Sequence, residues 1–144
     1  MVEFALVLPI MFTVFGACLD FARVYQAWIV LQGATRTGAE MAASSATSAS
    51  NAQAIAEAQV CTEATGLPGY IAGPGPGQCL QPDANVTFFS RSTTAPGGST
   101  RYPVATVTVT ATFPFRTLFS YPLLTSGGTW TLSATESYSV VQGR

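Results

Sequence analysis

Residues 1–26 read MVEFALVLPIMFTVFGACLDFARVYQ, and this stretch decides the architecture. No charged residue lies between Phe4 and Leu19, and a helix of that length spans about 24 Å at 1.5 Å per residue. That is slightly short of the roughly 20 residues that cross a bilayer core. Apolar character, however, continues past Asp20 to Leu31. The stretch therefore predicts a long hydrophobic helix that is able to span a membrane.

The composition of the whole chain excludes several classes of function. Only 9% of the 144 residues are charged, the net charge is −1, and there is no histidine. The charge balance gives no basis for nucleic-acid binding, and the lack of histidine removes the commonest general base and metal ligand. The GPGPG at 73–77 lacks the lysine and helix of a phosphate loop. We therefore expect a protein that is not an enzyme and has no cofactor, metal or nucleic-acid partner.

Glu3, Pro9 and Gly16 make the N-terminal apolar helix unusual for a simple anchor. A signal peptide is disfavoured because no basic residues precede the apolar run and the helical pattern continues beyond it. Glu3 places a carboxylate near apolar surroundings, which costs a few kcal/mol unless the group is paired. It either lies solvated among lipid headgroups or meets the amine of Met1, in the same or a neighbouring subunit. Pro9 is expected to kink or locally open the helix, and Gly16 to loosen it further.

Small residues recur every four positions beyond the apolar run, at Ala34, Gly38 and Ala42. This spacing allows close helix packing. An alanine-rich helix that packs on its own domain has the same pattern. We expect the C-terminal half of the helix to pack on the body and the N-terminal half to pack against copies of itself.

Three stretches carry a resemblance to a known family: MVEFALVLPI (1–10), GACLDFARVYQ (16–26) and LQGATRTGAEMAA (31–43). They closely resemble the N-terminal signature of TadE-like pilins, from the tight-adherence (Tad) branch of the type IV pilus superfamily. Members of this family begin with a basic leader that a prepilin peptidase removes. Because no such leader precedes Met1, the sequence looks like the processed product. The glutamate is the third residue here, whereas in most type IV pilins it is the fifth mature residue.

The resemblance implies a structural subunit of an extracellular pilus. Glu3 would neutralise the Met1 amine of a neighbour as subunits leave the inner membrane. The implied partners are copies of the chain in a helical filament, the prepilin peptidase, the Tad secretion machinery, and a host or abiotic surface. The implied contacts of the filament core are Phe4, Leu6, Leu8, Pro9, Ile10, Phe12, Phe15, Gly16, Leu19 and Phe21.

Two other functions remain open at this point. The chain could be a minor pilin (pseudopilin) that primes or caps a pilus made of another subunit. It could also be a membrane-anchored binding module that never polymerises. The abundance of the chain in sheared filaments distinguishes a structural subunit from a minor pilin. Retention in membranes identifies the binding module.

The body, residues 44–144, is predicted to begin with a second helix. A capping box from Ser50 to Gln53 would open this helix, which would run to about Ala64. A Gly/Pro-rich irregular loop follows at 66–84. In the oxidising setting that a surface pilus implies, the two cysteines that flank most of this loop should form a disulfide. These are Cys61 and Cys79, and Cys18 is left as a small buried hydrophobic residue in the stem.

Three strands are predicted after the loop, at 84–90, 102–113 and 129–141. The second alternates Val, Ala and Phe with Thr, which indicates one buried and one solvated face, and Pro114 should end it. A long hydrophobic helix (1–43), a short second helix and a small antiparallel sheet give an α+β, pilin-like fold. Asn85 begins an Asn-Val-Thr sequon, which is either a glycosylation site or a chance match.

Overall fold

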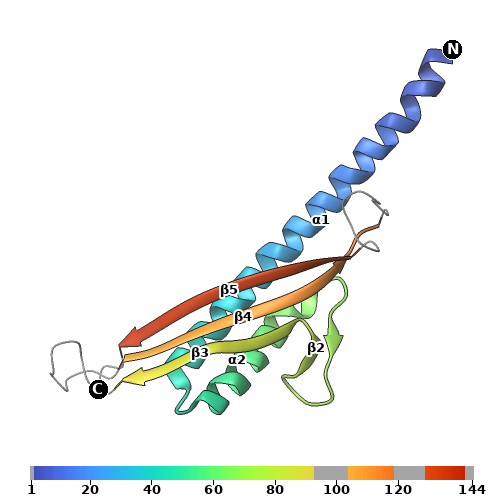
Figure 1. Cartoon of the computed structure of the whole chain (residues 1–144). Coiled ribbons are helices and arrows are strands. Elements are labelled where there is room, and N and C mark those ends of the chain that lie inside the picture. The colour runs from blue at the N-terminus through green and yellow to red at the C-terminus, as the bar shows by residue number, and fades with distance from the viewer. Residues whose placement is uncertain (1, 93–103, 119–128, 142–144) are drawn as a thin grey trace.

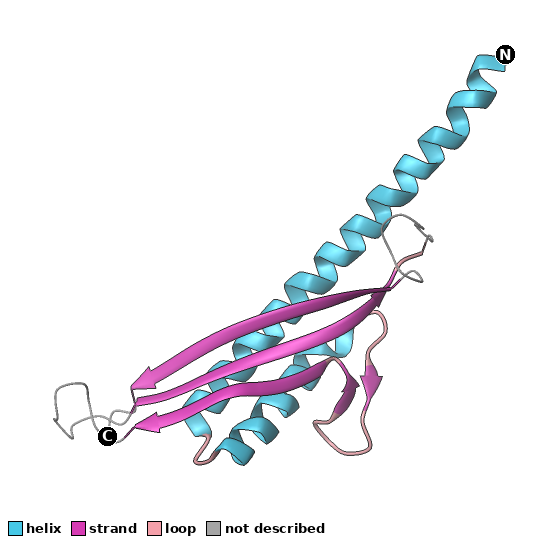
Figure 2. Ribbon diagram, in the orientation of Figure 1, coloured by secondary structure: helices cyan, strands magenta, loops and turns pink. Residues whose placement is uncertain are grey.

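The computed structural model describes residues 2–92, 104–118 and 129–141. A long helix, α1 (Val2–Ser45), projects far beyond a small body, in which a second helix and antiparallel strands pack on its C-terminal half. The α1 and α2 helices lie on one face of a three-stranded sheet, and among the described residues no helix covers the opposite face (Figure 1, Figure 2). The predicted α+β fold is confirmed.

Helix α1 is continuous from Val2 to Ser45 and includes Pro9. The expected local opening at Pro9 is therefore absent in this conformation, although proline has no N–H to donate to the carbonyl of Ala5. One turn later the hydroxyl of Thr13 donates to the carbonyl oxygen of Ile10 at 2.8 Å. The helix ends at Ser45, within the serine-rich segment where a break was predicted.

Helix α2 (Ala49–Glu63) has its N-cap two residues before Ser50, the residue predicted to cap it. Ser48 is the N-cap, and its hydroxyl accepts a hydrogen bond from the Asn51 N–H at 3.3 Å. Gln53 does not cap the helix, because its side chain binds strand β3 (Asp83–Ser92) instead. Its amide donates to the Ala84 carbonyl at 2.8 Å and accepts from the Val86 N–H at 2.6 Å.

The segment predicted to be an irregular loop contains regular structure. A 3₁₀ turn, η1 (Ala64–Gly66), follows α2, and two short strands, β1 (Ile71–Ala72) and β2 (Cys79–Gln81), pair antiparallel. Glycine makes this possible at Gly77, where φ is +74° and a Cβ would lie 3.0 Å from Ala58. The predicted disulfide between Cys61 and Cys79 is formed, and it joins α2 to β2.

The main sheet has the order β3-β4-β5, with β4 (Val104–Arg116) between β3 and β5 (Thr129–Val141). The prediction that Pro114 ends the middle strand is wrong, because β4 continues to Arg116 and Pro114 pairs with Thr131. The reason lies in the register. Strand β3 begins at Asp83, opposite Thr112, so no residue of β3 pairs with Pro114. Pro114 therefore lies at an edge of the sheet, where proline is tolerated.

The core lies between the inner face of the sheet and the two helices. The alternating residues of β4 are buried as predicted, and small residues of α1 and α2 pack against them. The partly buried inner residues of β5 complete this layer. Buried members include Leu31, Ala42, Ala56, Val60, Val107, Val109, Ala111, Phe113 and Phe115.

Candidate functional site

The N-terminal half of α1, which we call the stem (residues 4–21), has no apolar partner within the described part of the chain. Its large side chains are exposed on all sides; Phe4, for example, is 73% exposed. A soluble amphipathic helix would instead show a polar face. The stem therefore requires an apolar environment from outside the chain. The exposed large residues are Phe4, Leu6, Val7, Leu8, Ile10, Met11, Phe12, Val14, Phe15, Leu19 and Phe21.

The predicted filament-core residues are mostly in this exposed set. Pro9 is also exposed, whereas Gly16 is buried. Their contacts with other subunits remain predictions, because the structure contains a single chain. Met1 lies outside the described residues, as does the side chain of Glu3, so the charge pairing between them also remains a prediction.

Helix α1 is long and apolar enough to cross a membrane. A span of this kind extends from Leu6 to Ser45, and only 11% of its most apolar window is buried inside the chain. Length and composition alone do not separate a membrane span from another apolar helix. The low burial shows, however, that the body does not cover this window as it would cover a core helix.

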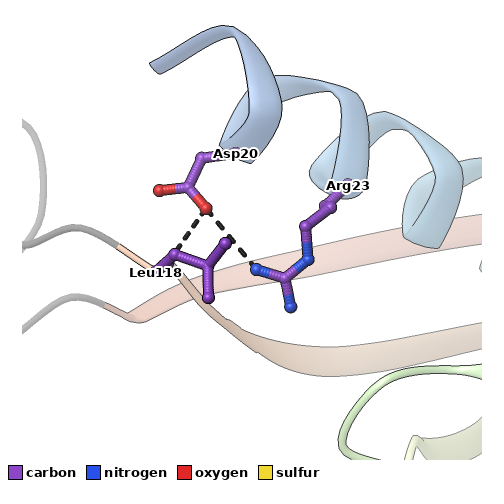
Figure 3. A network of polar contacts seen from close by, with 3 residues as sticks. All are labelled: Asp20, Arg23 and Leu118. Carbon is purple, nitrogen blue, oxygen red and sulfur yellow. Dashed lines mark hydrogen bonds and ion pairs between the residues drawn. The ribbon is translucent and has the colours of Figure 1, made fainter. Parts of the chain in front are cut away.

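A polar junction fixes the foot of the stem to the sheet. Asp20 is 3% exposed, and its carboxylate accepts a hydrogen bond from the Leu118 N–H at 2.9 Å (Figure 3). The same carboxylate lies 3.5 Å from a guanidinium nitrogen of Arg23, one helical turn further along α1. The Arg23 guanidinium also lies over the ring of Phe115, 5.4 Å from its centre. We call Asp20, Arg23, Phe115 and Leu118 the stem junction.

The stem junction is not predicted from the sequence, where Asp20 has no assigned partner. A signal was present, because an aspartate three residues before an arginine on one helix face predicts an ion pair. The partner at Leu118 was not predictable in this way, since 98 residues separate it from Asp20.

The small-residue face of α1 packs inside the chain. A Cβ built on Gly38 would lie 2.9 Å from the Val60 side chain and 3.1 Å from the Ala56 carbonyl oxygen, both on α2. Ala34 and Ala42 are buried in the same core. These residues thus hold the two helices close together.

Cys18 is exposed, so its interpretation as a buried hydrophobic residue is wrong for the isolated chain. Cys18 lies in the part of α1 that projects beyond the body, so its side chain has no core of the same chain to pack into. Asn85 is exposed on β3, opposite Thr110. Its glycosylation remains a prediction.

The described residues offer little for catalysis or cofactor binding. Within 2–92, 104–118 and 129–141, no group of three or more His, Cys, Asp or Glu residues could hold a metal ion. A hollow of about 390 Å³ lies between α1 and the segment 66–68, and Arg23 and Gln26 supply its polar side chains. An arginine and an amide do not form an acid–base pair.

Comparison with known proteins gives a match that includes the stem. The family model described as TadE-like protein matches residues 1–40. The first 40 residues are TadE-like. The matched TadE-like region includes the stem, Asp20 and Arg23 of its junction, and the first part of the small-residue face. No curated protein and no solved structure gives a significant match.

The predicted resemblance to TadE-like pilins is thus confirmed over residues 1–40. The match indicates a role related to the Tad pilus, and the matched family is structural rather than catalytic. It also indicates a location at the cell surface, and α1 is compatible with membrane anchoring of a precursor.

Proposed function

We propose that this chain is a structural pilin subunit. It polymerises through its N-terminal hydrophobic helix into an extracellular Tad or type IV-like pilus that is used for surface attachment. The observation that carries the proposal is the stem, a TadE-like helix that is apolar on all sides and projects from a folded body.

The hydrophobic effect holds the stems together once they have left the membrane, because separating them there would expose their apolar side chains to water. Full burial of one large apolar side chain contributes about 1.5–3 kcal/mol, and the stem exposes many such side chains. Stems packed side by side form a filament core, and the bodies lie outside it. A contact between two different surfaces of successive copies does not close on itself, so it produces a filament rather than a ring.

Glu3 sets the axial position of each subunit in this proposal. In the dry core its carboxylate pairs with the N-terminal amine of a neighbour, Met1 in this sequence. An unpaired carboxylate there is costly, so stems that are displaced along the axis are disfavoured.

The same stem anchors the subunit before assembly. The precursor resides in the inner membrane, is processed by a prepilin peptidase, and is passed to the Tad secretion machinery. The finished pilus contacts a host or abiotic surface. A minor pilin that primes or caps another filament would use the same stem, and the two roles differ in copy number.

The test replaces Glu3 with alanine in the native cell and measures filaments sheared from the surface. We expect a strong loss of filaments with normal membrane insertion. The matched control is Glu40→Ala, which removes an exposed carboxylate on the part of α1 beside the body. Normal piliation in the Glu3 variant would disprove the charge pairing.

Mass spectrometry of the sheared material from wild-type cells separates the remaining functions. A dominant subunit of this sequence supports the structural role, and its N-terminal peptide defines the processing site. A trace amount beside another pilin supports the minor-pilin role. Retention of all chains in the membrane would contradict both roles.

A further inference from the structure

The outer face of the main sheet is turned away from α1 and α2 (Figure 1). Threonine and serine side chains of β4 and β5 lie in two parallel rows there, and we call these rows the hydroxyl face. Cross-strand hydrogen bonds join the rows at Thr106–Ser139 (2.9 Å), Thr108–Ser137 (2.6 Å) and Thr110–Thr135 (3.0 Å).

These hydroxyl pairs retain hydrogen-bonding capacity. Each hydroxyl has one donor and two lone pairs, so one bond within a pair leaves one donor and three lone pairs for another molecule. Strand geometry spaces the groups regularly, at about 4.8 Å between strands and roughly 6.7 Å along a strand. No member of the three pairs is charged. The hydroxyl face therefore suits a flat, uncharged partner that is rich in hydroxyl groups.

An aromatic ring lies beside the hydroxyl rows. The register of β3 shifts between Val86 and Phe88, and this places Phe88 opposite Thr108 on the outer face. Phe88 is 52% exposed. Asn85, also exposed, lies opposite Thr110 and adds an amide to the same surface. The open part of this phenyl ring offers an apolar platform to another molecule.

We propose that the hydroxyl face and Phe88 bind a neutral polysaccharide. A sugar ring presents hydroxyl groups at its edges and C–H groups on its faces. The serine and threonine hydroxyls exchange hydrogen bonds with the edges, and the Phe88 ring covers a C–H face. The three pairs, Phe88 and Asn85 carry no charge to attract an ion, and the exposed carboxylate of Asp83, opposite Thr112 at the edge of the same face, disfavours an anionic partner, so we expect a neutral one.

This inference rests on the proposed attachment function, and it specifies the chemistry of the attached surface. The C-terminal half of α1 packs on the inner side of the sheet, so the hydroxyl face is directed away from the helix. In a filament with stems at its centre, this face is available on the outside.

The test uses the full-length chain in detergent micelles and two insoluble neutral polysaccharides, cellulose and chitin. The bound fraction after sedimentation is measured over a range of particle concentrations. We expect saturable binding to at least one of them, and no competition by the anionic polysaccharide alginate. Phe88→Ser should weaken binding about tenfold, and Thr108→Val, which keeps the shape of the side chain, roughly threefold. The control Ile71→Ser changes an exposed apolar residue on β1 and should bind like the wild type.

Circular dichroism of each variant confirms that the fold is intact. Absence of saturable binding to both polysaccharides would overturn the proposal, as would unchanged binding of folded Phe88→Ser. Loss of filament assembly by Phe88→Ser with intact polysaccharide binding would also overturn it, and would identify the face as a contact between copies. The micelle assay requires no filament. A chain that binds but never polymerises therefore disproves the proposed function alone.

Discussion

The Asp20 carboxylate accepts a hydrogen bond from the backbone N–H of Leu118 at 2.9 Å, across 98 residues of sequence. This bond joins the stem to the part of the sheet where β4 ends. The orientation of the apolar helix relative to the body therefore depends on a buried polar contact as well as on packing.

Replacing Asp20 with alanine should lower the free energy of unfolding of the body by about 1–3 kcal/mol. The variant leaves the Leu118 N–H without this acceptor and Arg23 without the carboxylate at 3.5 Å. Asp20→Asn keeps an oxygen acceptor and should lose less. Urea unfolding in detergent, followed by circular dichroism, measures the difference. Equal stability of wild type and Asp20→Ala would show that the junction adds nothing to the fold.

Two glycines of α1 should respond in opposite directions to replacement by alanine. A Cβ at Gly38 would lie 2.9 Å from Val60 and 3.1 Å from a backbone oxygen, so Gly38→Ala should separate the helices and cost about 1–3 kcal/mol. A Cβ at Gly33 has nothing within 4 Å, so Gly33→Ala should stabilise the helix by about 0.5–1 kcal/mol. Thermal unfolding of the pair under identical conditions provides the measurement. Stabilisation by both changes would contradict the close packing at Gly38.

Gln53 should contribute more to the free energy of unfolding than another glutamine of α2, Gln59. Its side chain bonds the backbone of β3 at both Ala84 and Val86. Gln53→Ala should therefore cost about 1–3 kcal/mol. Gln59→Ala is the matched control, because within the described part of the chain the Gln59 amide donates its hydrogen bond to Glu63, an i,i+4 pair worth a few tenths of a kcal/mol. Similar denaturation midpoints for the two variants would count against a special role of Gln53.

Removal of the disulfide should destabilise the body by about 3 kcal/mol in the chain-entropy account. The bond closes a loop with a sequence separation of 18 between Cys61 and Cys79. The double substitution Cys61→Ser and Cys79→Ser measures the effect without a reductant. Its melting temperature should also be insensitive to dithiothreitol, whereas that of the wild type should fall. A wild type that melts alike with and without the reductant would refute the prediction.

Local patterns predicted most of the fold. The period-two alternation gave the bounds of β5 and the buried face of β4, because burial on one side of a sheet imposes that period directly. The break between α1 and α2 followed from a run of poor helix formers. The apolar stretch at the N-terminus predicted the stem for a similar reason, since no charge interrupts it from Phe4 to Leu19.

Tertiary contacts explain where the sequence misled. Gln53 matched a capping pattern, but β3 offered it two backbone partners and Ser48 took the cap. Pro114 matched a strand terminator, but the end of β3 opened the edge beside it. The bond between Asp20 and Leu118 depends on how the sheet meets the helix, which neither local sequence specifies.

The stem of this protein has no polar side, and this restricts how a subunit can travel. Water around the stem would have to order itself over a continuous hydrocarbon-like rod, and two such rods meeting in solution would aggregate without defined register. A subunit therefore cannot diffuse freely through an aqueous compartment on its way to a partner. In the proposed filament it passes laterally from lipid to neighbouring stems, so we expect growth at the membrane, at the embedded end of the polymer, with the oldest subunits farthest from the cell.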